Sequence, residues 1–263
     1  MQKKSLILLL FAFTLVNAQC DKPLRIHSHN DYQNGATLFS ALKYCAKSIE
    51  ADVHLINGKL FVAHDLDEVD NLKTLESLYL NPLVKIIEDN KSPYNFNYEL
   101  FLLIDIKSNA DSTYFVLNKL LEKYDPYLTY YQNKIVYIRK IRVILSGNRP
   151  IDIVSNMEQR KVFLDGRLSD INRNYSSDLY PLISESGEKV LEIINDPVEE
   201  IKYKNLENLI AKIHNENKLV RFWGVPDNQE YWEMQENYGI DLINTDNVIE
   251  LSNFMSTQLK KAK

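Results

Sequence analysis

The chain has 263 residues, of which 45% are hydrophobic and 25% charged, a composition typical of globular proteins rather than of disordered or fibrous ones. Its net charge of -5, with no cluster of basic residues, argues against a nucleic-acid partner. Beyond the N-terminal segment there is no apolar span of membrane length, no repeat and no low-complexity linker. One domain over residues 19–263 is therefore the simplest organisation.

Residues 1–18 have the pattern of a secretory signal peptide. Two lysines precede the apolar stretch 6–16, and an acceptable cleavage site follows at residues 16–18. The stretch is short for a bilayer, so we expect export to the periplasm or the extracellular space and no stable transmembrane anchor. Lipoprotein attachment through Cys20 is less favoured, because the preceding Gln19 is not a small residue.

The sequence contains two cysteines, Cys20 and Cys45. An oxidising compartment can join them, which would tie the start of the mature chain to the first helix. Two free buried thiols are the alternative.

Short apolar runs alternate with segments of helical periodicity along the rest of the chain. Strands are predicted over residues 24–29, 48–55, 100–107, 141–147, 161–166, 179–185, 219–225 and 241–246. Helices are predicted over residues 37–47, 72–89, 111–124, 151–158, 187–217 with an interruption at Pro197, 228–238 and 246–258, with Asp111, Asn228 and Asp246 as N-caps. This alternation favours a (β/α)8 TIM barrel, with a doubly wound open sheet as the alternative.

Polar side chains gather at the carboxyl ends of the predicted strands, where (β/α)8 barrels carry their chemistry. In chain order they are His27, His29, Glu50, Asp52, Asp105, Lys107, Asp165, Arg167, Glu185, Arg221 and Asp246. We expect these side chains to surround one site at the mouth of the barrel.

The second strand carries two carboxylates inside an apolar run. Successive strand residues face opposite sides, so Glu50, Asp52 and His54 share one face. Two carboxylates that point into a barrel mouth repel each other unless a cation lies between them, and all-oxygen ligation suits Ca²⁺ or Mg²⁺. The alternative is a salt bridge to an arginine or lysine on a neighbouring strand.

Asn57-Gly58 predicts a β-hairpin whose returning strand leads to His64. A two-residue turn places Ala63 opposite Asp52, and in that register His64 faces away from the carboxylates. A bulge or an early end of strand pairing is needed to turn His64 inward.

Four motifs in this order resemble the barrel shared by phosphatidylinositol-specific phospholipases C and glycerophosphodiester phosphodiesterases. They are HSHNDY at 27–32, IEADV at 49–53, AHD at 63–65 and LLIDIK at 102–107, and GIDLINTD at 239–246 is similar to the last strand of the phosphodiesterases. The chain also resembles a little-studied branch with members in bacteria and fungi. The resemblance implies a (β/α)8 barrel of the phospholipase C-like phosphodiesterase type.

The same resemblance implies the site residues. His29 and His64 match the two catalytic histidines, with His27 as an alternative to His29. The metal ligands implied are Asn30, Glu50, Asp52 and Asp105. Asp105 stands where the family commonly has the longer Glu, which leaves its direct ligation open. Lys107 matches a phosphate-facing lysine, and Arg167 and Arg221 are further candidates for the substrate phosphate, with ion pairs to Asp or Glu as their alternative.

Together these features predict an exported, metal-dependent phosphodiesterase of lipid metabolism. It would use one divalent cation, Ca²⁺ or Mg²⁺, and general acid–base catalysis by two histidines on a glycerophosphodiester or inositol phospholipid. The alternatives are an inactive barrel that binds a phosphorylated ligand, and a metal-dependent hydrolase of another bond. An amidohydrolase is disfavoured, because its binuclear centre needs more histidines than the five in this sequence. The head group and the oligomeric state stay open.

Overall fold

The computed structural model describes residues 20–33, 35, 37–171, 173, 175–194 and 199–261. The predicted signal peptide and Pro197 lie outside the described residues. Within them, no helix has both the length and the apolar character that crossing a membrane requires.

Eight parallel strands form a closed barrel, as the sequence predicts. They follow one another around the barrel in the order of the chain, and pairing between the first and second closes the ring. The eight are β1 (Leu24–Ser28), β2 (Ala46–Ile56), β4 (Leu100–Ile106), β7 (Ile141–Gly147), β9 (Val162–Gly166), β10 (Leu182–Ser186), β11 (Leu219–Trp223) and β12 (Leu242–Thr245).

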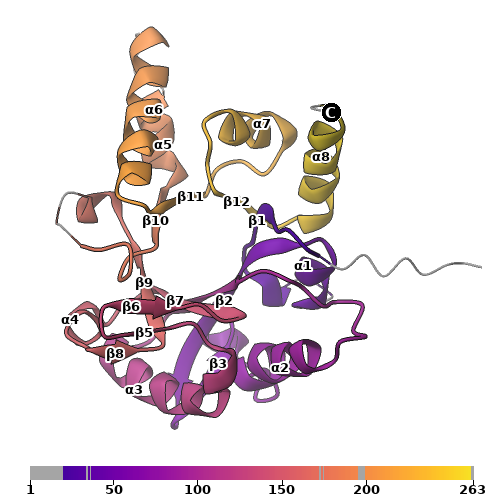
Figure 1. Ribbon diagram of the computed structural model, residues 1–263, viewed down its shortest axis with the longest axis vertical. Helices are drawn as coiled ribbons and strands as arrows, with labels where there is room; N and C mark the ends of the chain where they lie inside the picture. The colour runs from indigo at the N-terminus through magenta and orange to yellow at the C-terminus, as the bar shows by residue number, and fades with distance from the viewer. Residues whose placement is uncertain are drawn as a thin grey trace, which may run out of the picture.

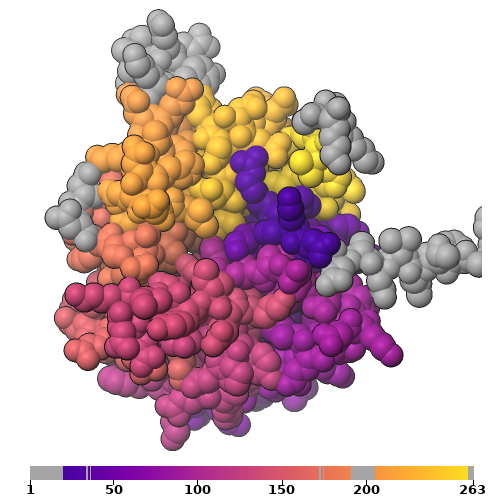
Figure 2. All heavy atoms as spheres, viewed as in Figure 1, coloured from indigo at the N-terminus to yellow at the C-terminus, as the bar shows by residue number. Residues whose placement is uncertain are grey.

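Helices between the strands cover the outside of the barrel (Figure 1). They are α1 (Phe39–Lys43), α2 (Asn81–Glu88), α3 (Ala110–Leu121), α4 (Ile151–Ser155), α5 (Gly187–Ile194), α6 (Glu199–Asn215), α7 (Gln229–Asn237) and α8 (Val248–Lys261), and the π-helix Glu76–Leu80 leads into α2. β1 and α1 pack against α8, so the first and last described parts of the chain meet (Figures 1 and 2).

The predicted helix ends are partly corrected. Asn228 caps α7 as predicted, but α3 is capped by Asn109, whose side chain accepts a hydrogen bond from the Ser112 N–H at 3.1 Å. α8 begins after Asn247, so Asp246 is not its cap. The first helix is shorter than predicted, because β2 already begins at Ala46.

The strand side chains form two apolar layers around the barrel wall. Outward-facing residues such as Ile49, Ala51 and Val53 are fully buried under the helices. Inward-facing apolar residues fill the barrel interior near the amino ends of the strands; they are Phe101, Leu103, Ile144, Phe163, Leu182 and Leu242. The inward-facing polar residues of the candidate site therefore lie at the carboxyl ends, while Lys47 and Arg142 lie over Phe101 near the amino ends.

β2 is longer than the other strands and serves two purposes. Its first half pairs with β1 and β4 in the barrel wall, and its last residues pair with the antiparallel β3 (Lys59–Val62). Asn57 and Gly58 form the turn with φ of 49° and 75°, the left-handed conformation that such a hairpin requires. The regular ladder ends at Val53 and Val62, with one further hydrogen bond from the Ala63 N–H to the Asp52 carbonyl at 3.3 Å, and this early end of pairing before His64 is the arrangement needed to turn His64 inward.

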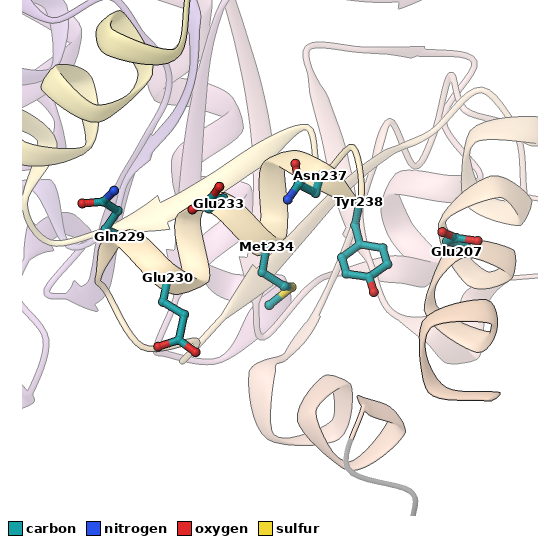
Figure 3. Close-up of a pocket in the computed structure, with 7 residues that line it drawn as sticks. All are labelled: Glu207, Gln229, Glu230, Glu233, Met234, Asn237 and Tyr238. Atoms are coloured by element: carbon teal, nitrogen blue, oxygen red, sulfur yellow. The ribbon is translucent and has the colours of Figure 1, made fainter. Parts of the chain in front are cut away.

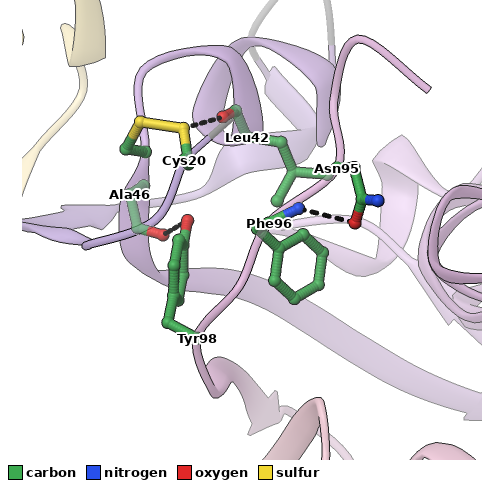
Figure 4. Close-up of a disulfide and its surroundings, with 7 residues drawn as sticks. Cys20, Leu42, Ala46, Asn95, Phe96 and Tyr98 are labelled. Carbon is green, nitrogen blue, oxygen red and sulfur yellow. Dashed lines mark hydrogen bonds between the residues drawn. A yellow bond between two sulfur atoms is a disulfide. The ribbon is translucent and has the colours of Figure 1, made fainter. Parts of the chain in front are cut away.

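Two features stabilise the amino-end side of the barrel. Cys20 and Cys45 form a disulfide, which holds the segment before β1 against the start of β2 (Figure 4). Beside it the Tyr98 hydroxyl donates to the Ala46 carbonyl at 2.8 Å.

A small antiparallel sheet, not predicted from the sequence, consists of β5 (Tyr130–Gln132), β6 (Ile135–Tyr137) and β8 (Gln159–Arg160).

Candidate active site

Three carboxylates converge at the carboxyl ends of β2 and β4. Glu50, Asp52 and Asp105 each place an oxygen within 4.8 Å of the others, and Asp52 lies directly beside Asp105 in the strand register. Glu50 and Asp52 are 4% and 1% exposed, so water does not screen their mutual repulsion. We call these three residues the acidic triad.

The two oxygens of Asp52 have different surroundings. Oδ2 accepts hydrogen bonds from the Tyr32 hydroxyl at 3.0 Å and from His64 Nδ1 at 2.9 Å, and lies 3.1 Å from Lys107 Nζ. Oδ1 is buried and has no hydrogen-bond partner among the described residues. A buried carboxylate oxygen without a partner costs free energy, so Oδ1 is suited to bind a cation inside the triad.

Glu50 lies between two nitrogen groups. Its Oε2 accepts a hydrogen bond from Arg221 Nη2 at 2.7 Å and lies 2.7 Å from His27 Nε2. Burial alone would raise the pKa of the Glu50 carboxyl, but Arg221 and the His27 hydrogen bond outweigh it and lower the pKa below its usual range. Glu50 is therefore ionised.

Arg221 is 3% exposed and also donates to Asn244 Oδ1 at 2.7 Å. The structure thus gives Arg221 the ion pair that was the alternative to a phosphate contact.

His27 and His29 differ in their capacity to transfer a proton. His27 is fully buried, with both ring nitrogens bonded to Ser48 and Glu50, and burial together with Arg221 lowers its pKa to about 3. His29 is 30% exposed at its side chain, and its Nδ1 lies 2.7 Å from Asp246 Oδ1. This geometry favours His29 as the proton-transferring residue.

Asp246, the carboxylate next to His29, also affects the pKa of the His29 ring. Burial would lower the pKa of His29, but the hydrogen bond to Asp246 and the charge of Glu50 raise it above its ordinary value. Asp246 fixes Nδ1, so Nε2 is the nitrogen available for proton transfer.

His64 approaches the triad from the loop after β3. Its Nδ1 is bonded to Asp52, its side chain is 47% exposed, and its carbonyl lies 3.2 Å from His54 Nε2. His54 therefore fixes the backbone of His64. Both predicted catalytic histidines are held at Nδ1 by a carboxylate, His29 by Asp246 and His64 by Asp52.

Lys107 and Asp105 complete the β4 side of the site. Lys107 Nζ lies 3.5 Å from Asp105 Oδ1, and its attraction to Asp105 and Asp52 raises its pKa despite partial burial, so Lys107 stays cationic. Burial raises the pKa of Asp105 to about 6, although Lys107 opposes the shift. Gly147, with φ of 63°, makes room for this carboxylate, since a Cβ there would lie 2.1 Å from Asp105 Oδ1.

The loop after β1 is fixed by a buried carboxylate. Asp31 Oδ1 accepts from the Ser28 hydroxyl at 2.7 Å, and Oδ2 accepts from the Leu38 N–H at 2.6 Å. Asn30, the predicted carbonyl ligand, is 8% exposed and has a left-handed φ of 42°. Asp31 therefore holds the turn that carries Asn30 and Tyr32.

Arg167 lies on the opposite side of the barrel mouth. Its Nη1 donates to Asp165 Oδ2 at 2.7 Å, and its guanidinium lies 4.9 Å from the centre of the Trp223 ring. The expectation that Glu185 faces the site is wrong, because in β10 it is Ser184 that faces inward while Glu185 pairs with Lys189 outside.

Surface hollows lie both at the site and away from it. One recess beside Lys107 is lined by the residues that follow β4 and β7. A groove between α6 and α7 carries three carboxylates, Glu207, Glu230 and Glu233 (Figure 3). This acidic groove contains no predicted site residue and would repel a phosphodiester.

The fold is a closed (β/α)8 barrel with the acidic triad and the two carboxylate-held histidines at the carboxyl ends of its strands. The structure is similar to a crystal structure of a glycerophosphodiester phosphodiesterase from Parabacteroides distasonis, with a TM-score of 0.55 and 15% identity over 91% of this chain and 97% of that one. At this identity the likeness shows the fold alone.

The family follows from the sequence comparisons. The model of the AIM6-like phosphodiesterase domain matches residues 18–165, more than half of the chain. Altered inheritance of mitochondria protein 6 of Eremothecium gossypii is 30% identical, over 88% of this chain and 69% of that protein. The Saccharomyces cerevisiae protein of the same name is 30% identical, over 89% and 71%. The chain belongs to the AIM6-like phosphodiesterase family.

Sequence reasoning did not find several supporting residues of the site. Gly147 makes room for Asp105, and Ser48 and Asn244 fix the orientation of His27 and Arg221. Asp246 was expected at the barrel mouth, but its hydrogen bond to His29 was not. Ser48 could have been identified from the sequence, because strand periodicity places it on the same face as Glu50. The other contacts depend on how neighbouring strands are aligned.

Proposed function

We propose that the chain is a metal-dependent phosphodiesterase that hydrolyses a glycerophosphodiester or a related lipid-derived phosphodiester. The observation that carries the proposal is the arrangement around Asp52, which holds His64 through Oδ2 and leaves Oδ1 buried within the acidic triad. Membership of the AIM6-like phosphodiesterase family supports it.

The donor set fits a hard divalent cation. Glu50, Asp52 and Asp105 supply carboxylate oxygens, and Asn30, which follows the neighbouring strand β1, is a further oxygen ligand implied by the family resemblance. When bound, Ca²⁺ or Mg²⁺ would neutralise phosphate charge and lower the pKa of a coordinated hydroxyl. Lys107 would share the phosphate charge.

The two histidines would divide the proton transfers between them. We propose that His29 Nε2 accepts the proton of the attacking hydroxyl, while His64 Nε2 donates a proton to the leaving alkoxide. Asp246 and Asp52 hold the opposite ring nitrogens, and this fixes the direction of each ring. The attacking group is either water or a hydroxyl of the substrate.

A substrate panel tests the proposal. Bis-p-nitrophenyl phosphate, glycerophosphocholine and an inositol phospholipid are incubated with the protein in Ca²⁺, Mg²⁺ or EDTA. We expect turnover of at least one diester, loss of activity in EDTA, and a rate about 100-fold or more lower in His29→Ala and His64→Ala. His214→Ala, whose ring pairs with Asp241 on the outside of the barrel, is the control and should keep full activity.

Activity that survives complete chelation, or that persists in both histidine variants, contradicts the proposal. Hydrolysis of amides without hydrolysis of diesters would favour the alternative function, a metal-dependent hydrolase of another bond. Binding of phosphate esters without turnover would favour an inactive ligand-binding barrel.

We further propose that the protein is exported. The N-terminal pattern of residues 1–18 supports this location, and so does the Cys20–Cys45 disulfide, because disulfides persist in oxidising compartments. Fractionation of the producing cells and N-terminal sequencing of the mature protein test the proposal. We expect an extracytoplasmic protein that begins near Gln19.

A further inference from the structure

Asp227 lies in the loop between β11 and α7, and both oxygens of its carboxylate accept hydrogen bonds. Oδ1 accepts from the Trp232 indole N–H at 2.7 Å. Oδ2 accepts from the Thr245 hydroxyl at 2.9 Å and from the Asp246 N–H at 2.8 Å. Asp227 therefore connects α7 with the carboxyl end of β12, where Asp246 bonds to His29.

Two buried side chains hold Asp227 in place, although the residue lies in an exposed loop. Trp232 is 4% exposed, and its ring packs against Phe254 of α8 with the ring centroids 5.8 Å apart. Thr245 is 1% exposed and is the last residue of β12, and its carbonyl accepts a hydrogen bond from the His29 N–H at 3.0 Å. The Asp227 carboxylate is thus fixed from both sides.

Asp246 depends on this support more than a buried residue would. It is the first residue after β12, and its side chain is 74% exposed, so packing does not fix the direction of its carboxylate. Its N–H is bonded to Asp227, and its Oδ1 lies 2.7 Å from His29 Nδ1. A rotation of the backbone that breaks the first bond would move the carboxylate away from the histidine ring.

We propose that Asp227 is a positioning residue that fixes the backbone of Asp246, so that Asp246 holds the His29 ring at Nδ1 and leaves Nε2 free for the substrate. This inference rests on the proposed role of His29 in proton transfer. The partner of one ring nitrogen determines which of the two nitrogens carries the proton. Asp227 acts through Asp246, and so affects the orientation and the tautomer of His29 rather than the chemistry itself.

Asp227→Ala tests the proposal, because it removes the acceptor of the Asp246 N–H. Asp241→Ala is the matched control. Asp241 precedes β12, and its Oδ2 likewise accepts a hydrogen bond from a backbone N–H, that of Val220 at 2.9 Å. Both variants lose a carboxylate at an end of the same strand, so we expect similar decreases in thermal unfolding temperature. The Asp227 carboxylate alone lies at the end that faces His29.

The first measurement needs no substrate. NMR of the histidine ring nitrogens in isotope-labelled protein distinguishes a protonated from an unprotonated nitrogen, and comparison with His29→Gln assigns the His29 signals. In the neutral ring of wild type we expect the proton on Nδ1, because Asp246 accepts it. Asp227→Ala should give a mixture of both tautomers, and Asp241→Ala should keep the wild-type form. A wild-type tautomer in Asp227→Ala overturns the proposal.

The second measurement uses a diester that wild type hydrolyses in the substrate panel. We expect Asp227→Ala to lower kcat about tenfold, the effect of one hydrogen bond, with little change in KM. Asp246→Ala should lower kcat at least as much. Adding Asp227→Ala to Asp246→Ala should lower it no further, because the two residues act in series. Asp241→Ala should keep the wild-type kcat.

A wild-type kcat in Asp227→Ala overturns the positioning role, as do losses that multiply in the double variant, because those would be independent effects. An equal loss in Asp241→Ala also overturns it, since the stability of β12 would then be the cause. If wild type hydrolyses no diester, the proposed function fails instead, and the NMR comparison alone decides whether Asp227 positions His29.

Discussion

Asp105 illustrates how a single glycine can decide the geometry of the site. The carboxylate occupies the space beside Gly147 that any other side chain would fill, and a Cβ at Gly147 would also lie 2.6 Å from the Ile106 carbonyl oxygen. Gly147 has a φ of 63°, which is strained for other residues. The residue therefore has both a conformational and a steric reason to be glycine.

We predict that Gly147→Ala lowers the affinity for Ca²⁺ or Mg²⁺ at least about tenfold, because Asp105 must leave the triad. The measurement is calorimetric metal titration, with urea unfolding to verify the fold. Gly239→Ala is the control, since φ there is 75° but nothing lies within 4 Å of the added Cβ. It should lose about 1 kcal/mol of stability from strain and keep its metal affinity. Equal metal affinities in both variants and wild type would refute the steric argument.

Lys47 lies away from the site and makes the free energy of unfolding depend on pH. Burial lowers the pKa of this lysine to about 8, only partly opposed by Glu99, and its Nζ lies 4.1 Å above the Phe101 ring. In the unfolded chain the pKa is close to 10.5. Between these values the unfolded chain binds the extra proton, so this residue's contribution to the free energy of unfolding increases as pH rises.

We therefore predict that the free energy of unfolding of wild type rises relative to that of Lys47→Met as pH rises from about 8 to about 10.5. Urea unfolding of both proteins at several pH values measures the difference, and effects of other titrating groups cancel in the comparison. A difference that stays constant with pH would show that the folded-state pKa of Lys47 is not lowered.

At the scale of elements, the sequence predicts the barrel strands well and the short connecting elements poorly. Each barrel strand is a short apolar run, and the alternation of side chains along a strand places Glu50 and Asp52 on one face. The strands of the small sheet, β5, β6 and β8, have only two or three residues, too few for a periodic signal. The N-cap of α3 is not predicted correctly, because Asn109 and Asp111 are equally suitable cap residues.

The contacts between strands explain what the sequence did not reveal about the site. Glu50 and Asp52 follow from one strand, but the pairing of Arg221 with Glu50 joins residues 171 positions apart. The early end of the β2–β3 hairpin, which brings His64 to Asp52, likewise depends on packing beyond the Asn57-Gly58 turn. Register across strands is a tertiary property that local patterns do not contain.

The disulfide belongs to the same scale, because it connects two segments that flank β1. Cys20 and Cys45 are separated by 25 positions, and the Cys20 carbonyl also accepts a hydrogen bond from the Asn97 N–H at 2.9 Å. We predict that replacing both cysteines with serine lowers the free energy of unfolding by about 3 kcal/mol, mainly because the unfolded chain gains freedom. Urea unfolding of the oxidised protein and the variant measures the loss.

Wild type treated with a reductant should lose the same amount, and the variant should not respond to the reductant. Unchanged stability on reduction would mean that the bridge is absent or contributes nothing. Because the acidic triad lies at the carboxyl ends of the strands and the disulfide near their amino ends, the double variant should retain its metal affinity.

For the whole molecule, the acidic triad links folding to metal binding. Two buried carboxylates and the partly buried Asp105 repel one another in the folded state, while the unfolded chain separates them in water. A cation that binds only the folded protein stabilises it by RT ln(1 + [M]/Kd), about 2.7 kcal/mol at a concentration 100 times Kd. We predict that saturating Ca²⁺ or Mg²⁺ raises the free energy of unfolding by roughly this amount and that EDTA reverses it.

Two variants test whether the stabilising metal binds at the acidic triad. Asp52→Asn should abolish the metal-dependent stabilisation, because it removes the charge of the triad carboxylate whose Oδ1 is buried without a partner among the described residues. Glu230→Gln, in the acidic groove between α6 and α7, should respond to metal like wild type. The opposite pattern, with the response lost in Glu230→Gln and kept in Asp52→Asn, would place the cation on the outer helices and remove the metal from the proposed chemistry.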